Sequence, residues 1–375
     1  MKITKISVYQ IELPIAGGGY GASEKTFYKS FDATIVKIET DSGIYGVGES
    51  IPFGSEYVSG FSLGALAGIK ELSPHLIGKD PRHVGKINEL MDSKLVGHYY
   101  VKSALDMACW DIFGKSVGLP LCDLLGGRLV DDIIVRMGIS AGSPEEMKAT
   151  LNSHRSEGYH HFSAKVGGHN TANDIERIRV ILAAMDPNET VVADANRGWA
   201  QHQALRVMNS VTDYHNIYFE QPCYTYEECL AVRKLCSCPL ILDECIEDLN
   251  DVLRLIKDRA ADGINIKIGR VGGINKTRQI RDMCALAGIG IYIQDTWASS
   301  IGAAAIAHLA HSTPQKTLFG IWHSVPWNTV ETAKGAPQMK DGYVYASSEP
   351  GLGVDVNFNL LGKPVAVYAL AVSFS

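Results

Sequence analysis

Three neighbouring stretches of the chain, ETVVADAN (189–196), NIYFEQPC (216–223) and PLILDEC (239–245), share one pattern. Each is a short apolar run, and each run ends in an acidic residue: Asp194, Glu220 or Asp243. Apolar runs of this length are typical of strands that are buried on both faces of a parallel sheet. The three stretches therefore predict consecutive β units, each with a carboxylate at the end of its strand.

The same rhythm of an apolar run followed by a helical pattern continues on both sides of these stretches. The other runs are DIIVRMGI (132–139), YHHFSAKVG (159–167), DGINIKIG (262–269), GIGIYIQDTW (288–297) and KTLFGIW (316–322). Strands that alternate with helices indicate an α/β fold with a parallel sheet, and eight such units favour a closed (β/α)8-type barrel. An open doubly wound sheet is the alternative, but no convincing GxGxxG follows any of the strands.

The two ends of the chain lie outside this repeat. Residues 1–50 predict a β-meander with strands at Ile3–Leu13, Ala33–Glu39 and Ile44–Glu49. Helical patterns follow at 62–76, 82–95 and 99–117. Residues after 340 contain no further β/α unit, and we expect them to pack back on the N-terminal meander.

Composition excludes several classes of function. The 375 residues are 46% hydrophobic and 20% charged, which is typical of a globular protein. The net charge of -6, without a basic block, argues against nucleic-acid binding. The first residues, MKITKISVYQIELPI (1–15), contain no apolar core of signal-peptide length, so we expect no signal peptide, and no apolar stretch in the sequence reaches membrane-spanning length. Eight cysteines without a CxxC pair indicate reduced thiols, and we expect a cytoplasmic protein without membrane contact.

Chemistry in such barrels takes place at the carboxyl ends of the strands. Besides the three acids, the residues at these ends include Lys165, Glu244, Lys267, Asp295 and Trp322. A charged residue in an apolar strand is costly to bury unless it is paired or liganded, although any single one could mark a strand that reaches solvent. Ionisable groups on six consecutive strands instead predict one shared cavity.

Asp194, Glu220 and Asp243 supply only oxygen ligands, which suits a hard cation, and Mg²⁺ fits best. Salt bridges to the two lysines are the alternative. Lys165 and Lys267 would stand on either side of the three acids, where a dication and the second lysine would lower the pKa of each ammonium group. A neutral lysine can act as a general base, so the pattern predicts removal and return of the α-proton of a metal-bound carboxylate.

These residues, in this order, resemble the enolase superfamily, in its mandelate racemase and muconate lactonizing branch. The resemblance covers essentially the whole chain. Further stretches that carry it are KSALDMACWDIFGK (102–115), PLCDLLGG (120–127), FEQP (219–222) and PGLGV (350–354). One departure is clear, because the branch usually has KxK on the second barrel strand and this chain has Ser163-Ala164-Lys165. Only the second lysine of that motif therefore carries over.

The resemblance implies a modified (β/α)7β barrel with an α+β capping domain that both chain ends build. The expected domains are 1–128 for the cap, 129–335 for the barrel and 336–375 for the segment that returns to the cap. The segments AGGGYGASEK (16–25) and IPFGSEYVSG (51–60) would close over the pocket. Ordinary surface loops are the alternative for both segments. One Mg²⁺ per subunit and a homo-oligomer are also expected.

Within the family, the closest resemblance is to the proline betaine 2-epimerases and the cis-3-hydroxyproline dehydratases. The residues expected to contact the substrate are Tyr57, Ser163, Asn196, Asp295, Trp297 and Trp322. The aromatic residues among them could attract a quaternary ammonium group, with Asp295 adding negative charge. The Ser163-x-Lys165 pattern favours the dehydratases instead.

The main functional hypothesis is therefore an Mg²⁺-dependent isomerase that epimerises a proline-type amino acid or proline betaine at C2, with Lys165 and Lys267 on opposite faces. Dehydration of cis-3-hydroxyproline is the first alternative. An N-acyl amino acid or dipeptide epimerase, or a muconate-type cycloisomerase, is the second. A descendant of the family that only binds ligands is a further class, which the intact set of lysines and acids disfavours.

Overall fold

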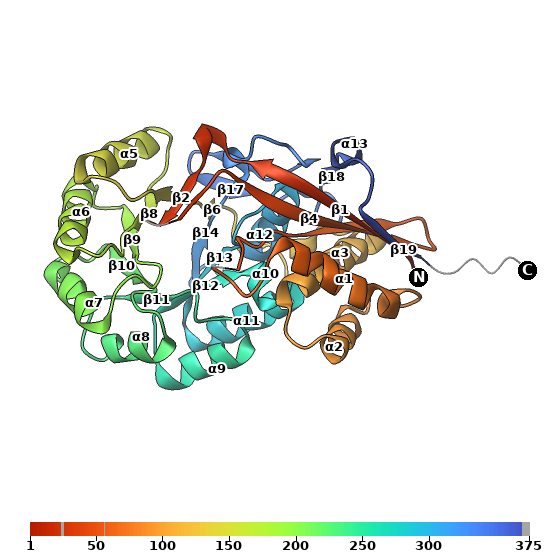
Figure 1. Cartoon of the computed structure of the whole chain (residues 1–375), viewed down its shortest axis with the longest axis horizontal. Helices are drawn as coiled ribbons and strands as arrows, with labels where there is room; N and C mark the ends of the chain where they lie inside the picture. Colours follow the sequence, from red (N-terminus) through yellow and green to blue (C-terminus); the bar gives the residue numbers. More distant parts are fainter. Residues whose placement is uncertain (24–25, 56, 370–375) are drawn as a thin grey trace, which may run out of the picture.

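The computed structural model describes residues 1–23, 26–55 and 57–369. Its largest sheet is an eight-stranded parallel barrel in the order β14-β13-β12-β11-β10-β9-β8-β7 (Figure 1). A single parallel bridge between Val135, just before β7, and Ile321, at the end of β14, links the two edge strands. The strands are β7 (Arg136–Ile139), β8 (His161–Lys165), β9 (Thr190–Asp194), β10 (Ile217–Glu220), β11 (Leu240–Leu242), β12 (Gly263–Lys267), β13 (Gly290–Gln294) and β14 (Leu318–Ile321).

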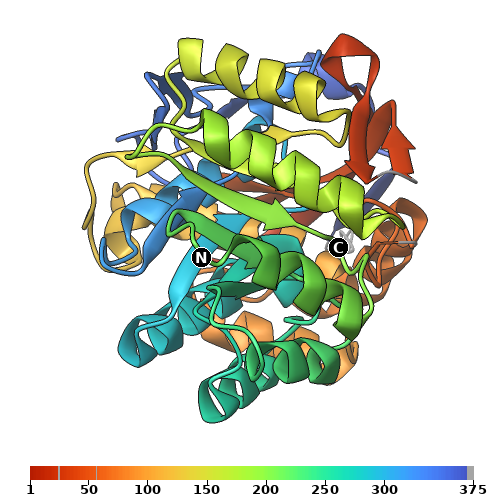
Figure 2. The same ribbon diagram turned by 90° about the vertical axis from the view of Figure 1, so that its left-hand side faces the viewer.

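Helices connect the strands and surround the barrel (Figure 2). They are α5 (Pro144–Ser156), α6 (Thr171–Ala184), α7 (Gln201–Met208), α8 (Tyr226–Arg233), α9 (Leu249–Asp258), α10 (Ile268–Val271), α11 (Ile274–Ala287) and α12 (Ser300–His311). The side chains of Ser143, Thr225 and Asp248 each accept hydrogen bonds from backbone N–H groups in the first turn of α5, α8 and α9. These caps define where the helices begin.

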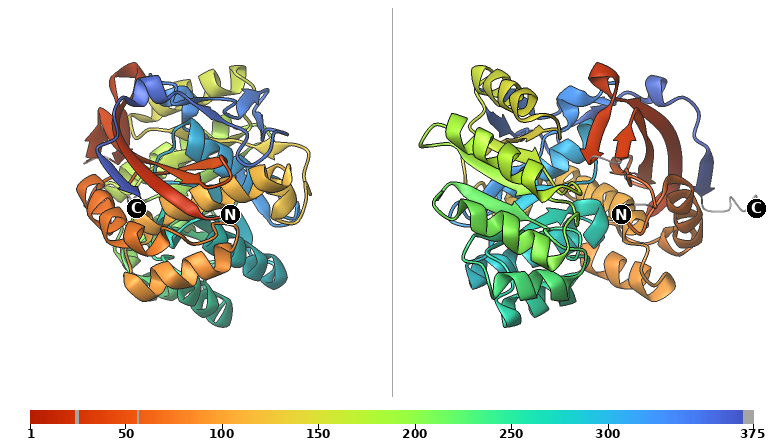
Figure 3. Two further views of the ribbon diagram at one scale, coloured as in Figure 1. Left: turned by 90° about the vertical axis from the view of Figure 1, so that its right-hand side faces the viewer. Right: turned by 60° about the vertical axis from the view of Figure 1, so that its left-hand side comes forward.

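The second part of the fold is an antiparallel sheet in the order β19-β1-β4-β5, packed against helices (Figure 3). The strands are β1 (Ile3–Pro14), β4 (Ser30–Thr40), β5 (Tyr45–Ser50) and β19 (Ala366–Ala369), and the helices are α1 (Ser62–Leu76), α2 (Val84–Lys94) and α3 (Tyr99–Val117). Helix α3 lies so close to β5 that a Cβ atom at Gly48 would come within 2.1 Å of the Ala104 carbonyl oxygen. Glycine is therefore required there.

The return of the chain to the N-terminal sheet agrees with the expectation, because β19 pairs with β1. Another part of the C-terminal segment pairs elsewhere. Strand β17 (Tyr343–Tyr345) pairs with β6 (Ile133–Ile134) next to the barrel. The remaining elements are η1 (Ala16–Gly18), β2 (Tyr20–Ser23), β3 (Thr26–Tyr28), α4 (Leu121–Leu124), η2 (Asn209–Val211), η3 (Val325–Trp327), β15 (Ala333–Lys334), β16 (Gln338–Lys340), β18 (Asp355–Val356) and α13 (Phe358–Leu361). Of the helices in the described ranges, none has the length and apolarity that a membrane span requires.

Candidate active site

The barrel brings the charged strand ends together. Five of them lie on the last residue of a strand or on the residue after it: Lys165, Asp194, Glu220, Asp243 and Lys267. All five line one cavity of about 40 Å³. The sequence therefore predicted their convergence correctly.

Lys165 ends β8 and is the register partner of Asp194 on β9. Its Nζ donates to Asp194 Oδ2 at 2.6 Å and to Asn196 Oδ1 at 2.9 Å. Burial by itself lowers the pKa of Lys165, but attraction to Asp194 outweighs it and raises the pKa above its ordinary value. The lowering of the Lys165 pKa that a bound dication would cause stays a prediction.

Lys267 ends β12, and its Nζ donates to Asp243 Oδ2 and, at 2.9 Å, to the Tyr57 hydroxyl. The Tyr57 hydroxyl in turn donates to Asp243 Oδ2 at 3.3 Å. Arg270 donates from Nη1 to the other oxygen, Asp243 Oδ1, at 2.7 Å. Burial opposes ionisation of Asp243, but Lys267 and Arg270 hold its pKa well below the ordinary value. Asp243 is therefore an anion held between two cations.

Glu220 is buried and is held from two sides. Arg136 Nη2 donates to Glu220 Oε2 at 3.1 Å, and the Asn265 amide donates to Glu220 Oε1. The Arg136 guanidinium also stacks 3.6 Å from the centre of the Tyr292 ring. Burial, and after it repulsion from Asp194, raises the pKa of Glu220 to about 8. A buried carboxylate with this pKa lacks sufficient positive charge around it.

The donor set fits a divalent cation in its chemistry. Asp194, Glu220 and Asp243 are all buried oxygen donors on adjacent strands, and Asp194 and Glu220 are register partners. As they stand, the carboxylates point to cationic side chains, and within the described ranges no group of three His, Cys, Asp or Glu residues is arranged to hold a metal ion. The salt bridges that the sequence left open are therefore present. Burial, and after it repulsion from Asp194, raises the pKa of Glu220, and a cation at this position would oppose both effects.

The two lysines approach the cavity from opposite walls. β8 and β12 are separated by β9, β10 and β11, so they are four strands apart in an eight-stranded barrel. Four strands are half the circumference. A planar substrate atom held between these walls would therefore present one face to Lys165 and the other face to Lys267.

The residues predicted to contact the substrate divide into two groups. Tyr57, Ser163, Asp295 and Trp322 line the cavity. Ser163 faces the same way as Lys165 because the two are separated by one residue on a strand. Burial raises the pKa of Asp295 to about 6, although Asp295 accepts hydrogen bonds from the backbone N–H groups of Thr296 and Gly269.

Asn196 and Trp297 are not among the residues that line this cavity, and contact with the substrate stays a prediction for both. Asn196 accepts a hydrogen bond from Lys165 and donates one to Glu244 Oε1 at 3.2 Å. Trp297 is 2% exposed and donates from Nε1 to Asn328 at 2.7 Å. Their contacts suit support of other side chains, since each polar group already has a protein partner.

Both glycine-containing segments reach the cavity. Tyr20, from 16–25, and Phe53 and Tyr57, from 51–60, line it. Tyr20 packs edge-on against Trp322 with ring centres 5.5 Å apart. Residues 24, 25 and 56 of these segments lie outside the described part of the chain. The described parts therefore cover the open end of the barrel as expected.

Backbone strain is concentrated beside the acids. Asn196, Arg197 and Gln221 have positive φ values of 42°, 66° and 38°, although none is glycine. Each follows a strand-end carboxylate within three residues. Gln221 connects two of these strands, because its Oε1 accepts from the backbone N–H of Asp243 at 2.9 Å. Strained residues at such positions are typical of functional sites, where surrounding contacts hold them.

Comparison with known families agrees with this geometry. Residues 146–360 match the enolase C-terminal domain-like family, and residues 22–126 match the mandelate racemase / muconate lactonizing enzyme N-terminal domain. The chain belongs to the mandelate racemase/muconate lactonizing enzyme branch of the enolase superfamily. The expected fold, a modified barrel with a capping domain, is thereby confirmed.

Relatives in this superfamily are enzymes. The chain is 44% identical over 369 residues to the cis-3-hydroxy-L-proline dehydratase of Roseibium aggregatum, and the aligned region covers 98% of this chain and 100% of the relative. It is 30% identical over 369 residues to the N-succinyl-L-Arg/Lys racemase of Bacillus cereus, covering 96% and 97% of the two chains. A crystal structure of an enolase superfamily member from Roseovarius nubinhibens, complexed with magnesium, superimposes with a TM-score of 0.93 at 38% identity, covering 98% and 99%.

Four further residues contact this group or line the cavity without having been predicted from the sequence: Arg136, Asn265, Arg270 and Tyr20. Arg136 and Asn265 lie in apolar strand runs, where a polar side chain is itself a signal of a partner inside the barrel. Arg270 follows Lys267 by three residues and lies in α10, the short helix that continues directly from β12. Tyr20 had no local signal, because only the tertiary fold brings the 16–25 segment over the barrel.

Proposed function

We propose that this superfamily member dehydrates a cis-3-hydroxyproline-type imino acid after abstraction of its α-proton. The observation that carries the proposal is the pair of lysines on opposite barrel walls, facing one cavity with three acids. The 44% identity to a cis-3-hydroxy-L-proline dehydratase over nearly the full length favours dehydration over the 2-epimerisation that the sequence first indicated.

Asp194, Glu220 and Asp243 would hold one Mg²⁺ per subunit. When bound, the ion would neutralise the substrate carboxylate and so make the neighbouring α-proton more acidic. Arg136 and Asn265 keep Glu220 in place from below, and Arg270 does the same for Asp243. These contacts hold the carboxylate side chains in the cavity before the ion arrives, which reduces the cost of ordering them.

The stereochemistry of the cis substrate suits two opposed lysines. In a cis-3-hydroxyproline the hydroxyl group lies on the same ring face as the carboxylate, so the α-hydrogen and the hydroxyl group lie on opposite faces. One lysine, as the neutral amine, would take the α-proton. The other, as the ammonium ion, would give its proton to the departing hydroxyl group on the opposite face. One water leaves, and the C2–C3 double bond that forms gives a pyrroline-2-carboxylate.

Epimerisation at C2 remains the second candidate, because the same two lysines could exchange a proton between the two faces. The relationship to N-succinyl-L-Arg/Lys racemase supports it. The two outcomes differ in what the ring carries at C3. A substrate with a leaving group there is dehydrated, whereas proline, which has none, could only exchange or invert its α-hydrogen.

The test is a product assay in D2O with purified protein. Cis-3-hydroxy-L-proline, trans-3-hydroxy-L-proline, L-proline and L-proline betaine are each incubated with Mg²⁺ and, separately, with EDTA. We expect Mg²⁺-dependent formation of pyrroline-2-carboxylate from the cis isomer at a rate far above that of the trans isomer. Inversion of proline or its betaine, without dehydration of either hydroxyproline, would contradict the proposal and support epimerisation.

A further inference from the structure

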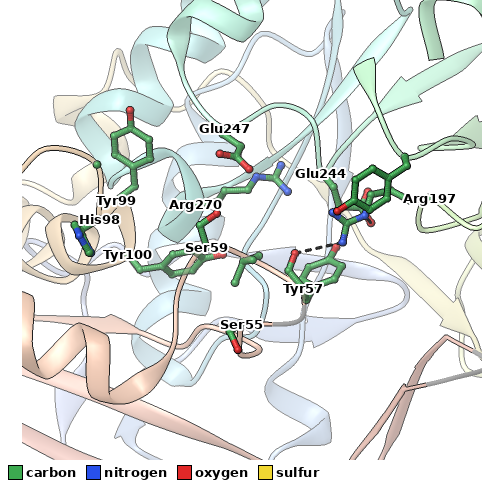
Figure 4. A pocket seen from close by; sticks show the side chains of 13 residues that line it. Ser55, Tyr57, Ser59, His98, Tyr99, Tyr100, Arg197, Glu244, Glu247 and Arg270 are labelled. Carbon is green, nitrogen blue, oxygen red and sulfur yellow. Dashed lines mark hydrogen bonds and ion pairs between the residues drawn. The ribbon is translucent and has the colours of Figure 1, made fainter. Parts of the chain in front are cut away.

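A second cavity of about 370 Å³ lies beside the catalytic one (Figure 4). Its wall contains the start of α3, the residues after β9 and β11, and part of the 51–60 segment. Tyr57 lines both cavities. Since the catalytic cavity measures only about 40 Å³, the outer one offers more room to a small molecule that approaches the barrel.

Two deeply buried polar groups in this outer cavity have atoms without a partner. Glu244 is 6% exposed and Arg270 is 5% exposed. Glu244 uses Oε1 for Asn196, and Arg270 uses its two terminal nitrogens for Asp243 and the Asn265 carbonyl oxygen. Glu244 Oε2 and Arg270 Nε have no hydrogen-bond partner in the described part of the chain. Buried polar atoms are rarely left unpaired, so these two side chains of the cavity wall keep hydrogen-bonding capacity that the protein itself does not use.

The charges that line the cavity are balanced. Arg197 and Arg270 bring two positive charges, Glu247 brings a negative charge, and Glu244 brings a second negative charge when it is ionised. Figure 4 shows Arg270 between the α3 residues on one side and Glu244 on the other. A wall with residues of both signs suits a zwitterion. An anion would be repelled by the two glutamates, and a cation would be repelled by the two arginines.

The N-terminus of helix α3 adds positive charge to the cavity wall near Arg270. Gly97, His98, Tyr99 and Tyr100, at its N-terminus, line the cavity, and no side chain caps this end of the helix. The helix has 19 residues, so its first N–H groups carry a substantial positive end of the helix dipole. A carboxylate is thereby attracted to Arg270 and the start of α3, while an ammonium group is attracted to Glu244 and Glu247.

We propose that the outer cavity is a separate binding site for a small zwitterionic amino or imino acid, which occupies it before entering the catalytic cavity. This inference rests on the proposed function in its choice of ligand. Tyr57 forms the partition, since its hydroxyl group is bonded to Lys267 and Asp243 on the catalytic side. On the other side, the Arg197 guanidinium lies 5.8 Å from the centre of the Tyr57 ring.

The first test reverses one charge of the outer cavity. Glu247 is exposed and has no role in the catalytic group, so Glu247→Lys is expected to fold. We expect it to raise KM for cis-3-hydroxy-L-proline by roughly threefold to tenfold and to leave kcat within about twofold, as for a charge partly screened by solvent. Glu176→Lys, which reverses an exposed charge on α6, is the matched control and should change neither value.

The second test needs no turnover. Binding of L-proline, N-acetyl-L-proline and L-prolinamide to the Mg²⁺-free protein is measured by calorimetry. We expect L-proline, the zwitterion, to bind most tightly and Glu247→Lys to weaken it. Equal binding of the three probes, or an unchanged KM and unchanged proline affinity in Glu247→Lys, would overturn the inference. Proline binding that depends on Glu247 without any dehydration would instead remove the proposed function and keep the outer site.

Discussion

Binding of Mg²⁺ should depend steeply on pH because of Glu220. Burial and the neighbouring Asp194 raise the pKa of Glu220 to about 8 in the metal-free protein. Only the ionised carboxylate is a ligand for Mg²⁺, so the ion must displace a proton from Glu220 whenever the pH is below this value. The perturbation is therefore a change of pH from 9 to 6 at constant ionic strength.

The magnitude follows from the fraction of Glu220 that is ionised. With a pKa of about 8, that fraction is about 90% at pH 9, about 9% at pH 7 and about 1% at pH 6. The apparent affinity for Mg²⁺ should therefore fall about tenfold from pH 9 to pH 7, and about ninetyfold from pH 9 to pH 6. Binding at pH 7 should release close to one proton, and binding at pH 9 about a tenth of one.

Titration calorimetry in two buffers with different ionisation enthalpies measures both the affinity and the protons released. Burial and repulsion from Asp243 also raise the pKa of Glu244, to about 7, so this neighbour must be controlled for. Glu244→Gln should keep the pH dependence, because Glu220 is unchanged in it. An Mg²⁺ affinity that stays constant between pH 6 and pH 9, with no proton release, would refute the assignment of Glu220 as a buried metal ligand.

Three further outcomes are expected. At pH 9, where Glu220 is mostly ionised, Arg136→Met should lower the free energy of unfolding in urea by about 3 kcal/mol, since it leaves the buried carboxylate without its cation. Arg136→Lys should lose less, and equal stability of the two variants would count against this ion pair. Burial raises the pKa of Glu49 to about 7. The protonated Glu49 side chain therefore contributes stability that is fully present below the pKa of Glu49 in the unfolded chain and is lost as the pH rises to about 7. Glu49→Gln should therefore gain about 2 to 3 kcal/mol relative to the unsubstituted protein between pH 5 and pH 8, and a constant difference would contradict the shift. Trp322→Ala should raise KM with little loss of stability, whereas Trp297→Ala should lower the free energy of unfolding by about 3 to 5 kcal/mol, and a reversed pattern would show that Trp297 contacts the substrate.

The barrel could be predicted because its signals are local. Each strand is a short apolar run, and Lys267, which the sequence placed at the end of its strand, is the last residue of β12. The pairing of β17 with β6 could not be predicted in this way, because it joins residues about 210 positions apart and neither strand has a distinctive sequence. Residues 132–139 formed two strands, β6 and β7, since Val135 leaves one sheet for the other.

The site could be predicted where position along a strand decided the geometry. Lys165, Asp194 and Glu220 each end a strand, so their meeting follows from barrel topology alone. The role of Trp297 could not be read in the same way, because it depends on which way the chain turns after β13. The 2.6 Å contact between Lys165 and Asp194, which raises the pKa of Lys165, could not be predicted either, because it depends on side-chain positions that only coordinates reveal.

The proposed function requires that the two lysines on opposite walls of the barrel do different work on one substrate. The most direct test compares Lys165→Ala and Lys267→Ala with cis-3-hydroxy-L-proline in D2O, following Cα deuteration by NMR and pyrroline formation together. We predict that neither variant dehydrates the substrate, that the variant which keeps the base still exchanges the α-hydrogen, and that the other does not. Dehydration by either variant at a rate near that of the unsubstituted protein would contradict the account.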